Sequence, residues 1–449
     1  MRTYFIVCLF SLFMMGALPL TNAHEFQVGQ SVILKAAKPV GVPIHREPAP
    51  SFLQHVPSGT TGIIEKISKN NQWLSLRLSS GETGWVHDKY VETSSKASPS
   101  PGPAHTTPHL PSDSPQSRPV NIHIGEEEAV WTSREQCQTA LGKGARMAPE
   151  TAQQLRIGTW NIRWFPLGAP PDQPEDFAEA TDLDWITCVI QWMQIDVLAV
   201  QEILATPEAT QALQTVTGNL TDKTGHTWKW YRQPCGHLDD HHIALLWNDS
   251  RVSLTNFESL WEFNSKAGNG SNPCTYGLRP GQYAHVQSRT TNGVDFHLIA
   301  IHLKSGPTVF DVEERHKALN RIDQAIAPYL KQDQDVVILG DFNTMGAGDW
   351  NSRDYEIKNL RRHLEKEKPG FSDLEPRPQC SHYFRGRGGW LDHILVPHNM
   401  KEITLKSTTV TGYCALARCQ RIRGDYPSAY RQLSDHCPVV MEIQNTDQD

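Results

Sequence analysis

From Leu155 onward, short apolar runs bounded by polar residues alternate with segments of helical apolar spacing. The runs are typical of buried strands, while residues 182–194 and 312–330 have the spacing of helices. This alternation predicts an α/β (α+β) fold, a four-layer α/β sandwich in which two packed sheets are flanked by helices. The runs lie at residues 155–160, 197–200, 243–247, 296–301, 336–339, 394–396 and 439–443.

Polar and ionisable residues gather at the ends of these runs. Strand ends are rigid, so side chains there can converge on one cleft. Four of them are acidic, and converging carboxylates would repel one another or take up protons unless a cation were present. Mg²⁺ prefers oxygen ligands and keeps waters for a substrate phosphate, so we expect a Mg²⁺ site that could also take Mn²⁺. The residues are Asn161, Glu202, His302, Asp341, Asn343, Asp392, Asp435 and His436.

These residue types favour attack of water on a phosphodiester. His302 and His436 titrate near neutral pH by type, so they can move protons or stabilise charge at phosphorus. Asn161 and Asn343 can hydrogen-bond a phosphate without adding negative charge. One such residue alone is more often a helix cap or a structural group. The prediction therefore rests on the whole ordered set, and neither a GxSxG sequence nor a Walker loop competes with it.

Residues 155–443 resemble the endonuclease/exonuclease/phosphatase superfamily, which includes deoxyribonuclease I. The resemblance implies an enzyme that hydrolyses phosphate esters with a divalent metal ion. It covers about two-thirds of the chain and leaves residues 24–120 unaddressed. The matching stretches are Thr159–Arg163, Val200–Glu202, Ile301–Ser305, Gly340–Asn343, Trp390–Ile394 and Leu433–Val439.

By this resemblance, Asn161 and Glu202 belong to the metal site, and Asp435 lies close enough to share it. One departure concerns the partner of His302. Members similar to deoxyribonuclease I carry an acidic residue just before the run at 243–247. Here that stretch reads Asp-Asp-His-His, with His241 or His242 near the place. The partner of His302 therefore stays open.

The resemblance implies catalytic roles for the other residues of the set. Asp341 and Asn343 should orient the attacking water and the phosphate. His302, and His436 together with Asp392, should supply proton transfer and charge stabilisation.

Members of the superfamily act on DNA, RNA, sphingomyelin or inositol phosphates, and three features favour nucleic acid. Residues 302–305 and 383–386 look like stretches of exported bacterial nucleases, and arginines gather late in the chain. The net charge of −7 argues against a tight nucleic-acid binder, but a bound ion supplies positive charge locally. We expect an endonuclease that hydrolyses DNA or RNA. The arginines are Arg385, Arg387, Arg418, Arg421, Arg423 and Arg431.

Two other classes of function stay open. A phosphodiesterase or phosphatase acting on sphingomyelin or inositol phosphates would need an apolar membrane-facing loop, and the insertion at 260–278 begins with Leu260-Trp261-Glu262-Phe263. A non-enzymatic wall-binding protein would lack the carboxylates. Trp390 can either stack on a base or belong to the core.

The amino terminus reads as an export signal. Arg2 precedes an apolar run that ends near Leu18, and Ala23 offers a small residue before a cleavage point. An anchoring helix is the alternative, but the run is short for a span. After cleavage at 1–23 no transmembrane segment is expected, which predicts a secreted or periplasmic protein.

Eight cysteines remain after the signal, an even count that favours disulfides in an exported chain. Buried thiols or a zinc site are the alternatives, and no CxxC pair supports zinc. The connectivity stays open, including a pair between Cys414 and Cys419. The eight are Cys137, Cys188, Cys235, Cys274, Cys380, Cys414, Cys419 and Cys437.

Ahead of the catalytic domain at 155–449, the chain divides into three parts. Residues 24–93 hold short strand-like runs and predict a small all-β barrel, whose end resembles bacterial SH3-like domains. Such a domain implies a cell-wall or peptide ligand, although a spacer without a ligand is the alternative. Residues 94–120 form a Pro/Ser-rich linker. Residues 121–154 are an unassigned connecting segment.

Overall fold

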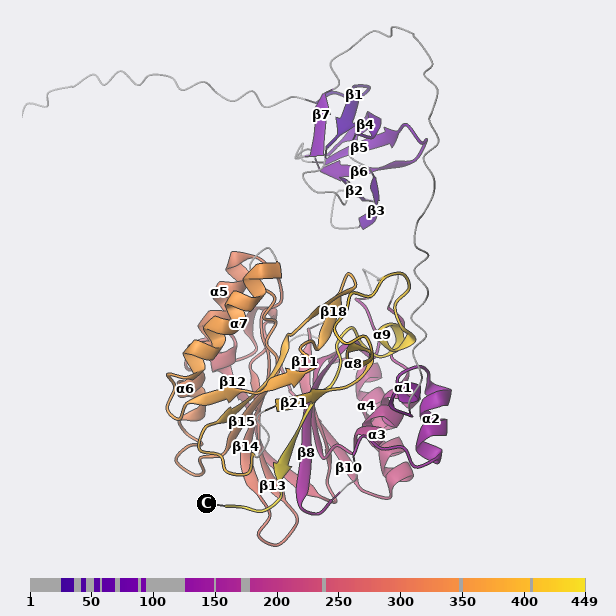
Figure 1. Cartoon of the computed structure of the whole chain (residues 1–449). Helices are drawn as coiled ribbons and strands as arrows, with labels where there is room; N and C mark the ends of the chain where they lie inside the picture. Colours follow the sequence, from indigo (N-terminus) through magenta and orange to yellow (C-terminus); the bar gives the residue numbers. More distant parts are fainter. Residues whose placement is uncertain are drawn as a thin grey trace, which may run out of the picture. The chain divides into compact units, whose positions relative to one another are not determined.

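The computed structural model describes residues 26–35, 42–45, 52–56, 59–68, 73–87, 90–93, 126–148, 151–170, 178–235, 240–346, 350–403 and 407–448. The chain divides into two compact units, residues 1–116 and 117–449 (Figure 1). The predicted signal at 1–23 and the predicted linker at 94–120 lie outside the described residues.

The first unit is all-β, as predicted. Its seven strands form one antiparallel sheet in the order β3-β2-β6-β5-β4-β1-β7. Alternating side chains such as Leu74 and Leu76 of β5 bury one face of each strand, which is why these runs alternate in sequence. The strands are β1 (Ser31–Leu34), β2 (Val42–His45), β3 (Phe52–Val56), β4 (Thr61–Ile67), β5 (Trp73–Leu78), β6 (Thr83–His87) and β7 (Val91–Thr93).

The second unit contains two large sheets. The first has the order β10-β11-β9-β8-β22-β21-β17 and the second the order β12-β13-β14-β15-β20-β16. All seven apolar runs predicted as strands are central members of these sheets. The first sheet consists of β8 (Gln154–Phe165), β9 (Val197–Ile203), β10 (Trp228–Arg232), β11 (His242–Asn248), β17 (Glu375–Arg377), β21 (Ser407–Val410) and β22 (Val439–Gln444). The second consists of β12 (Val252–Leu260), β13 (Gly281–Ser288), β14 (Asp295–His302), β15 (Val336–Asp341), β16 (Phe371–Asp373) and β20 (Asp392–Pro397).

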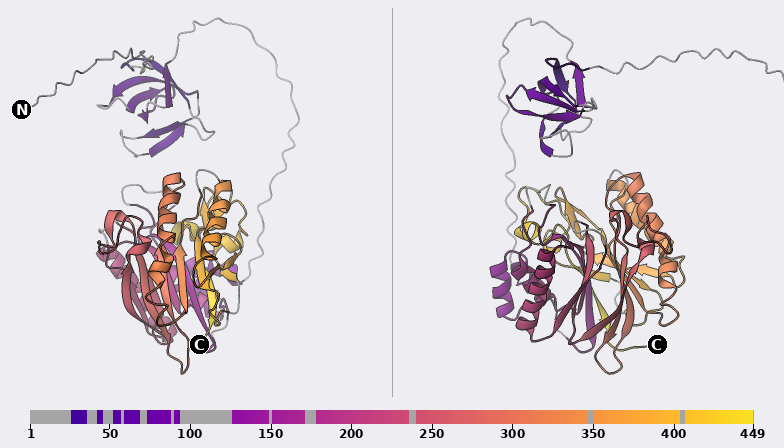
Figure 2. Two further views of the ribbon diagram at one scale, coloured as in Figure 1. Left: turned by 90° about the vertical axis from the view of Figure 1, so that its left-hand side faces the viewer. Right: turned by 180° about the vertical axis from the view of Figure 1, so that it is seen from behind.

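Helices cover the outer face of each sheet, so the predicted sandwich of packed sheets flanked by helices is confirmed (Figure 2). Side chains of β14 alternate between two cores. Leu298 and Ala300 pack in the core shared by both sheets, while Ile299 and Ile301 pack beneath the helices of the second sheet. The first sheet is covered by α1 (Glu126–Val130), α2 (Arg134–Gly142), α3 (Leu183–Met193) and α4 (Pro207–Thr224), and the second by α5 (Val309–Leu319), α6 (Ile322–Ile326) and α7 (Trp350–Leu364).

Two helix assignments differ from the sequence prediction. The helix expected over 312–330 begins earlier, at the capping box of Thr308 and Asp311, and is broken into α5 and α6 near Asn320. Helix α4 was not predicted, although Thr206 caps its first turn and Gly225 ends it in the left-handed conformation.

The described part of the connecting segment belongs to the second unit. Trp131 packs edge-on against Trp160 of β8, and a disulfide joins Cys137 of α2 to Cys188 of α3. The core of the second unit therefore begins upstream of Leu155.

All eight cysteines form disulfides, as predicted. The pairs are Cys137–Cys188, Cys235–Cys274, Cys380–Cys419 and Cys414–Cys437. Four disulfides are consistent with an extracellular protein. Within the described residues, no helix combines the length and the apolar character needed to span a bilayer.

The topology places the predicted site residues at one edge of the two sheets. Strand β8 runs parallel to β9, and β14 runs parallel to β15, so their carboxyl ends coincide. Strands β20 and β22 pair antiparallel with β15 and β8, and their amino ends therefore reach the same edge. The register sets Asp341 of β15 beside both His302 and Asp392.

Gly340 is required where β15 approaches β14. Its φ is +144°, and a Cβ there would lie 2.0 Å from the carbonyl oxygen of Ile301. We expect Gly340→Ala to lower the free energy of unfolding by at least ~1–3 kcal/mol, measured by denaturant titration. Gly218 in the middle of α4 is the control, because nothing lies within 4 Å of an added Cβ. Gly218→Ala should be neutral or stabilising, and equal effects of the two substitutions would contradict this account.

Candidate active site

Asn161, at the carboxyl end of β8, connects the two sheets. Its buried Nδ2 donates to Oε1 of Glu202 at 2.9 Å and to Oδ2 of Asp341 at 3.0 Å. The backbone N–H of Arg163 donates to Oδ1 of Asn161 at 3.0 Å, which fixes the orientation of the amide. One side chain thus holds a carboxylate from each sheet.

Glu202 is fixed on both of its oxygens. Oε1 accepts from Asn161, and Oε2 accepts from the backbone N–H of Trp164 at 3.0 Å. The residue has a φ of +64°, an uncommon conformation that turns the chain out of β9. Such strain is maintained only where the surroundings over-determine it, which fits a functional position.

His436 and Asp392 form a buried pair. Nδ1 of His436 and Oδ2 of Asp392 lie 2.8 Å apart, and the hydroxyl of Ser381 donates to the same oxygen at 2.6 Å. Burial lowers the pKa of His436, but the attraction of Asp392 and Asp341 outweighs it and raises the pKa to about 10. His436 is therefore an imidazolium at neutral pH.

Asp341 lies between two imidazoles without bonding to either. Its Oδ2 is 3.6 Å from Nε2 of His302 and 3.8 Å from Nε2 of His436, beyond hydrogen-bond range. Its Oδ1 accepts from the backbone N–H of Asn343 at 2.8 Å. Burial, with repulsion by Asp392, raises the pKa of Asp341 to about 7 despite the attraction of His436. Asn343, with a φ of +52°, is held by a bond from Nδ2 to the carbonyl of Leu303.

His382 joins the site from the hairpin of β18 (His382–Phe384) and β19 (Arg387–Gly389). Its Nε2 lies 3.6 Å from Oδ2 of Asp435, and its ring centroid is 4.5 Å from that of His436. Burial raises the pKa of Asp435, but His382 and His436 outweigh it, so the pKa lies below its usual range. His382 is not among the residues predicted from the sequence.

His302 makes no hydrogen bond to an acidic side chain among the described residues, and Oδ2 of Asp341 lies 3.6 Å from its Nε2. Its Nδ1 is buried and makes no hydrogen bond, and the ring of His241 lies nearly parallel to its ring at 6.0 Å. Burial, aided by Arg279 and His241, holds the pKa of His302 well below its usual value. Arg279, also absent from the sequence prediction, donates to the carbonyl oxygens of His302 and Leu303 at 3.2 and 3.1 Å.

All eight residues predicted from the sequence thus lie at this edge. Together with His241 and His382, their carboxylates and imidazoles form clusters whose ligand atoms are close enough to hold a metal ion. These clusters are Glu202–His241–His302, His382–Asp435–His436 and Asp341–Asp392–His436.

The sequence profile of the endonuclease/exonuclease/phosphatase family matches residues 158–436, more than half of the chain. The chain belongs to this family. Members of the endonuclease/exonuclease/phosphatase family are typically phosphodiesterases or nucleases, and they generally use divalent metal ions. The acidic and imidazole clusters described above could hold such an ion.

The chain also matches solved structures at low sequence identity. The family protein from Bacteroides vulgatus is 15% identical and covers 66% of this chain and 100% of its own, with a TM-score of 0.43. D. rerio TDP2, complexed with a single-strand DNA product, is 17% identical over 65% of this chain and 99% of its own, with a TM-score of 0.43. The 3' phosphatase NExo from Neisseria, bound to a product DNA hairpin, is 18% identical over 65% and 99%, with a TM-score of 0.41. Among curated proteins, no sequence matches the chain.

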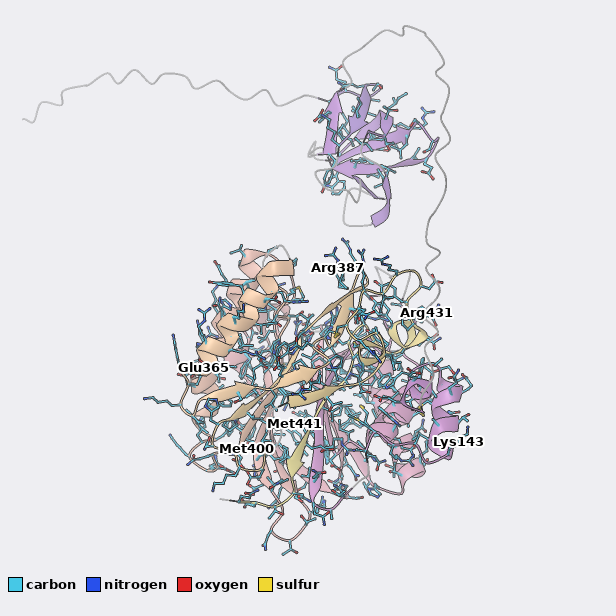
Figure 3. All side chains as sticks on the ribbon, viewed as in Figure 1. Lys143, Glu365, Arg387, Met400, Arg431 and Met441 are labelled. Carbon is cyan, nitrogen blue, oxygen red and sulfur yellow. A yellow bond between two sulfur atoms is a disulfide. The ribbon has the colours of Figure 1, made fainter. Side chains whose placement is uncertain are left out.

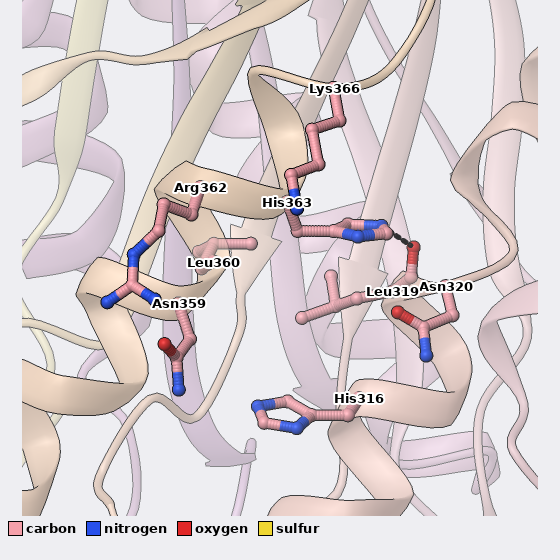
Figure 4. Close-up of a pocket in the computed structure, with 8 residues that line it drawn as sticks. All are labelled: His316, Leu319, Asn320, Asn359, Leu360, Arg362, His363 and Lys366. Atoms are coloured by element: carbon pink, nitrogen blue, oxygen red, sulfur yellow. Dashed lines mark hydrogen bonds between the residues drawn. The ribbon is translucent and has the colours of Figure 1, made fainter.

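A separate pocket of about 300 Å³ lies between α5 and α7 (Figure 4). None of the residues predicted for the family's active site lines it. It is a surface feature of the helical layer, unconnected to the strand-end cluster. The lining residues are His316, Leu319, Asn320, Asn359, Leu360, Arg362, His363 and Lys366.

The pair of His436 and Asp392 predicts an alkaline limit of activity. Because the pKa of His436 is raised to about 10, its positive charge persists through neutral pH and is lost only near that value. In the metal-free chain, the stability that the pair adds should likewise disappear as the pH rises through about 10. Asp392→Asn should move the alkaline fall of kcat toward neutral pH, measured as a pH–rate profile. A profile with an unmoved alkaline limb would contradict this assignment.

Proposed function

We propose that this chain is an exported, divalent-metal-dependent phosphodiesterase that hydrolyses nucleic acid, with DNA as the main substrate. The observation that carries the proposal is the cluster in which Asn161 holds Glu202 and Asp341 beside the pair of Asp392 and His436. This arrangement offers oxygen ligands for a cation, a carboxylate to orient water and an imidazolium to face a phosphate.

The charges of the cluster fit a divalent cation. Four carboxylates meet there, and the pKa values of His241, His302 and His382 are lowered by burial, so these rings are neutral at neutral pH. Asn161, Glu202 and Asp435 would hold Mg²⁺ or Mn²⁺, in accord with the preference of these ions for oxygen. When bound, the ion would supply positive charge at the phosphate.

The remaining groups would position the reactants. Among the described residues, Oδ2 of Asp341 accepts a hydrogen bond from Asn161 alone. This oxygen can therefore also accept from a water and orient it. Asn343 is held rigidly beside it and can hydrogen-bond the phosphate. His436, as an imidazolium, would stabilise the negative charge that develops on the phosphate oxygens, and His302 would assist from the opposite side of Asp341.

Exposed arginines beside the site favour nucleic acid. At the turn of the β18–β19 hairpin, the carbonyl oxygen of Gly386 accepts from the backbone N–H of Ile422, and a disulfide ties Cys380 to Cys419. This brings together an arginine rim, and Phe384, 52% exposed, extends beside it. Among the described residues, no carboxylate forms an ion pair with Arg385, Arg421 or Arg423. The arginine rim consists of Arg385, Arg387, Arg421 and Arg423.

The other late arginines contribute less to this rim. Arg431 forms an ion pair with Glu179 at 3.4 Å, although it lies at the same end of the unit as Arg387 (Figure 3). Trp390 is buried and stacks on His393, so it belongs to the core and is not available to a base. The exposed arginine rim is the feature that fits a phosphate backbone.

A lipid phosphodiesterase is the second candidate. The insertion at 260–278 does not support it, because Leu260 and Phe263 are buried. Two exposed apolar residues at the start of α5 support it instead: Val309 is 65% exposed and Phe310 is 53% exposed. Hydrolysis of sphingomyelin vesicles should therefore be measured beside hydrolysis of plasmid DNA, and we expect DNA to be the better substrate.

We further propose that export depends on residues 1–23 and that the first unit is an SH3-like domain that binds cell wall or peptide. The four disulfides support export, because such bonds persist in oxidising compartments. The antiparallel sheet of the first unit is compatible with an SH3-like domain. Pull-down of the full chain on purified cell wall would test the ligand.

Asp341→Asn and His436→Ala should each lower kcat for DNA on the order of a hundredfold or more, because Asp341 would orient the attacking water and His436 would stabilise charge on the reacting phosphate. Both variants should stay folded by thermal melt, and EDTA should abolish the activity of the parent until Mg²⁺ or Mn²⁺ is restored. The matched controls are Asp295→Asn and His285→Ala. These residues form a similar pair at 3.0 Å, with Asp295 at the opposite end of β14. Folded site variants with the parent's rate would refute the proposed function.

Arg385→Ala and Arg423→Ala should raise KM for DNA several-fold and weaken its salt dependence, with kcat little changed, since the rim would bind phosphates away from the reacting one. Hydrolysis of bis(p-nitrophenyl) phosphate, which is too small to reach the rim, should not change. Arg362→Ala on α7 serves as a control for the loss of an exposed arginine. Equal effects of all three substitutions on KM would remove the rim from the binding surface.

A further inference from the structure

The environment of His302 contains two ring nitrogens without partners. Nδ1 of His302 is buried and makes no hydrogen bond within the described residues, and the same holds for Nε2 of His241. The side chain of His302 is only 2% exposed, so water does not readily satisfy it. Buried polar atoms are nearly always paired, so two such atoms in neighbouring rings point to a place where a ligand binds.

The spacing of the surrounding atoms indicates which kind of ligand fits between these side chains. Nε2 of His241 lies 3.8 Å from Oε2 of Glu202, too far for a hydrogen bond. Ligand atoms of Glu202, His241 and His302 all lie within 4.8 Å of one another. Two ligands about 2.1 Å from the same ion lie roughly 3.0–4.2 Å apart, so only small adjustments would close this group around a metal.

We propose that Glu202, His241 and His302 bind a transition-metal ion of the Zn²⁺, Co²⁺ or Mn²⁺ class. Nδ1 of His302 is the nitrogen available to the ion, because Nε2 faces Asp341. Two imidazoles and one carboxylate suit such ions, whereas Mg²⁺ prefers oxygen ligands throughout. The inference deepens the proposed metal dependence, on which it rests through the shared Glu202, but it concerns binding rather than turnover.

The protein around this site holds the rings in place. The ring of Trp164 packs edge-on against His241 with centroids 4.1 Å apart, and the adjacent His242 bonds through Nδ1 to the carbonyl of Gln233 at 3.1 Å. Arg279 lies close by but donates to the carbonyl oxygens of His302 and Leu303, and the carboxylate of Glu202 faces His241. A rigid set of ligands lowers the entropy cost of binding an ion.

The ion would take the place of the acidic partner that the sequence resemblance implies for His302. In the related enzymes the sequence resemblance implies an acidic residue beside His302, and His241 is near that place. An ion on Nδ1 would fix the ring and leave its proton on Nε2, the atom that faces Asp341. His302 would then act as a hydrogen-bond donor toward the phosphate and not as a base.

The test is metal binding by the full chain after removal of metal with EDTA and dialysis. Zn²⁺, Co²⁺ and Mg²⁺ are titrated separately by calorimetry, and the visible absorption of the Co²⁺ form reports nitrogen ligation. The parent should bind one more equivalent of Zn²⁺ or Co²⁺ than His241→Ala, or bind it at least tenfold more tightly. His241→Glu should shift the preference toward Mg²⁺, since it replaces a nitrogen ligand with oxygen.

His285→Ala is the matched control, because it removes an imidazole that pairs with a carboxylate elsewhere in the same unit. It should bind metal like the parent. Thermal melts of the metal-free proteins confirm that each variant folds, and His241→Gln provides a milder substitution if His241→Ala does not. Zn²⁺ and Co²⁺ binding that is the same in the parent and in folded His241 variants would overturn the inference.

The outcomes separate this inference from the proposed function. Zn²⁺ binding that depends on His241, in a protein that cuts no nucleic acid with any metal, would support the site and refute the nuclease proposal. Metal-dependent hydrolysis of DNA, with metal binding that does not depend on His241, would support the nuclease proposal and overturn this inference.

Discussion

The amide of Asn161 is the interaction on which the arrangement of the site depends. It is the one described side chain that bonds a carboxylate of each sheet, Glu202 from the first and Asp341 from the second. Two buried carboxylates would otherwise repel across the gap between the sheets. A neutral donor between them fixes their separation without cancelling the negative charge that a cation requires. The packing of the sheets and the chemistry of their edge are therefore set by the same contact.

The charge differs on the two sides of Asp341. On one side, Asp392 and Asp341 keep His436 protonated, while on the other, burial and Arg279 keep His302 neutral. His436 and His302 both face Asp341, but they differ in protonation because His436 also lies beside Asp392, whereas His302 lies near Arg279. Such divergence of neighbouring titratable groups is how a site assigns distinct roles to chemically identical side chains.

The sequence predicted the central strands because both of their faces are covered, which makes them continuous apolar runs, as in β15. Strand β12 escaped prediction because Thr255, Asn256 and Glu258 leave one face exposed. Residues at the ends of central strands were recognisable for the same reason. His382 and Arg279 were not, because a hairpin and a loop deliver them, and their position depends on tertiary contacts that no local pattern records.

The disulfides Cys380–Cys419 and Cys414–Cys437 lie beside His382 and His436 in the chain. Each bond fixes the backbone within two residues of an imidazole of the site. The geometry of His436 and its neighbours thus depends on whether these cysteines are oxidised, although no sulfur atom belongs to the cluster. A freshly made, reduced polypeptide would carry every group of the site but lack the covalent restraints that hold two of them in register. Maturation of the site would therefore be linked to entry into an oxidising compartment.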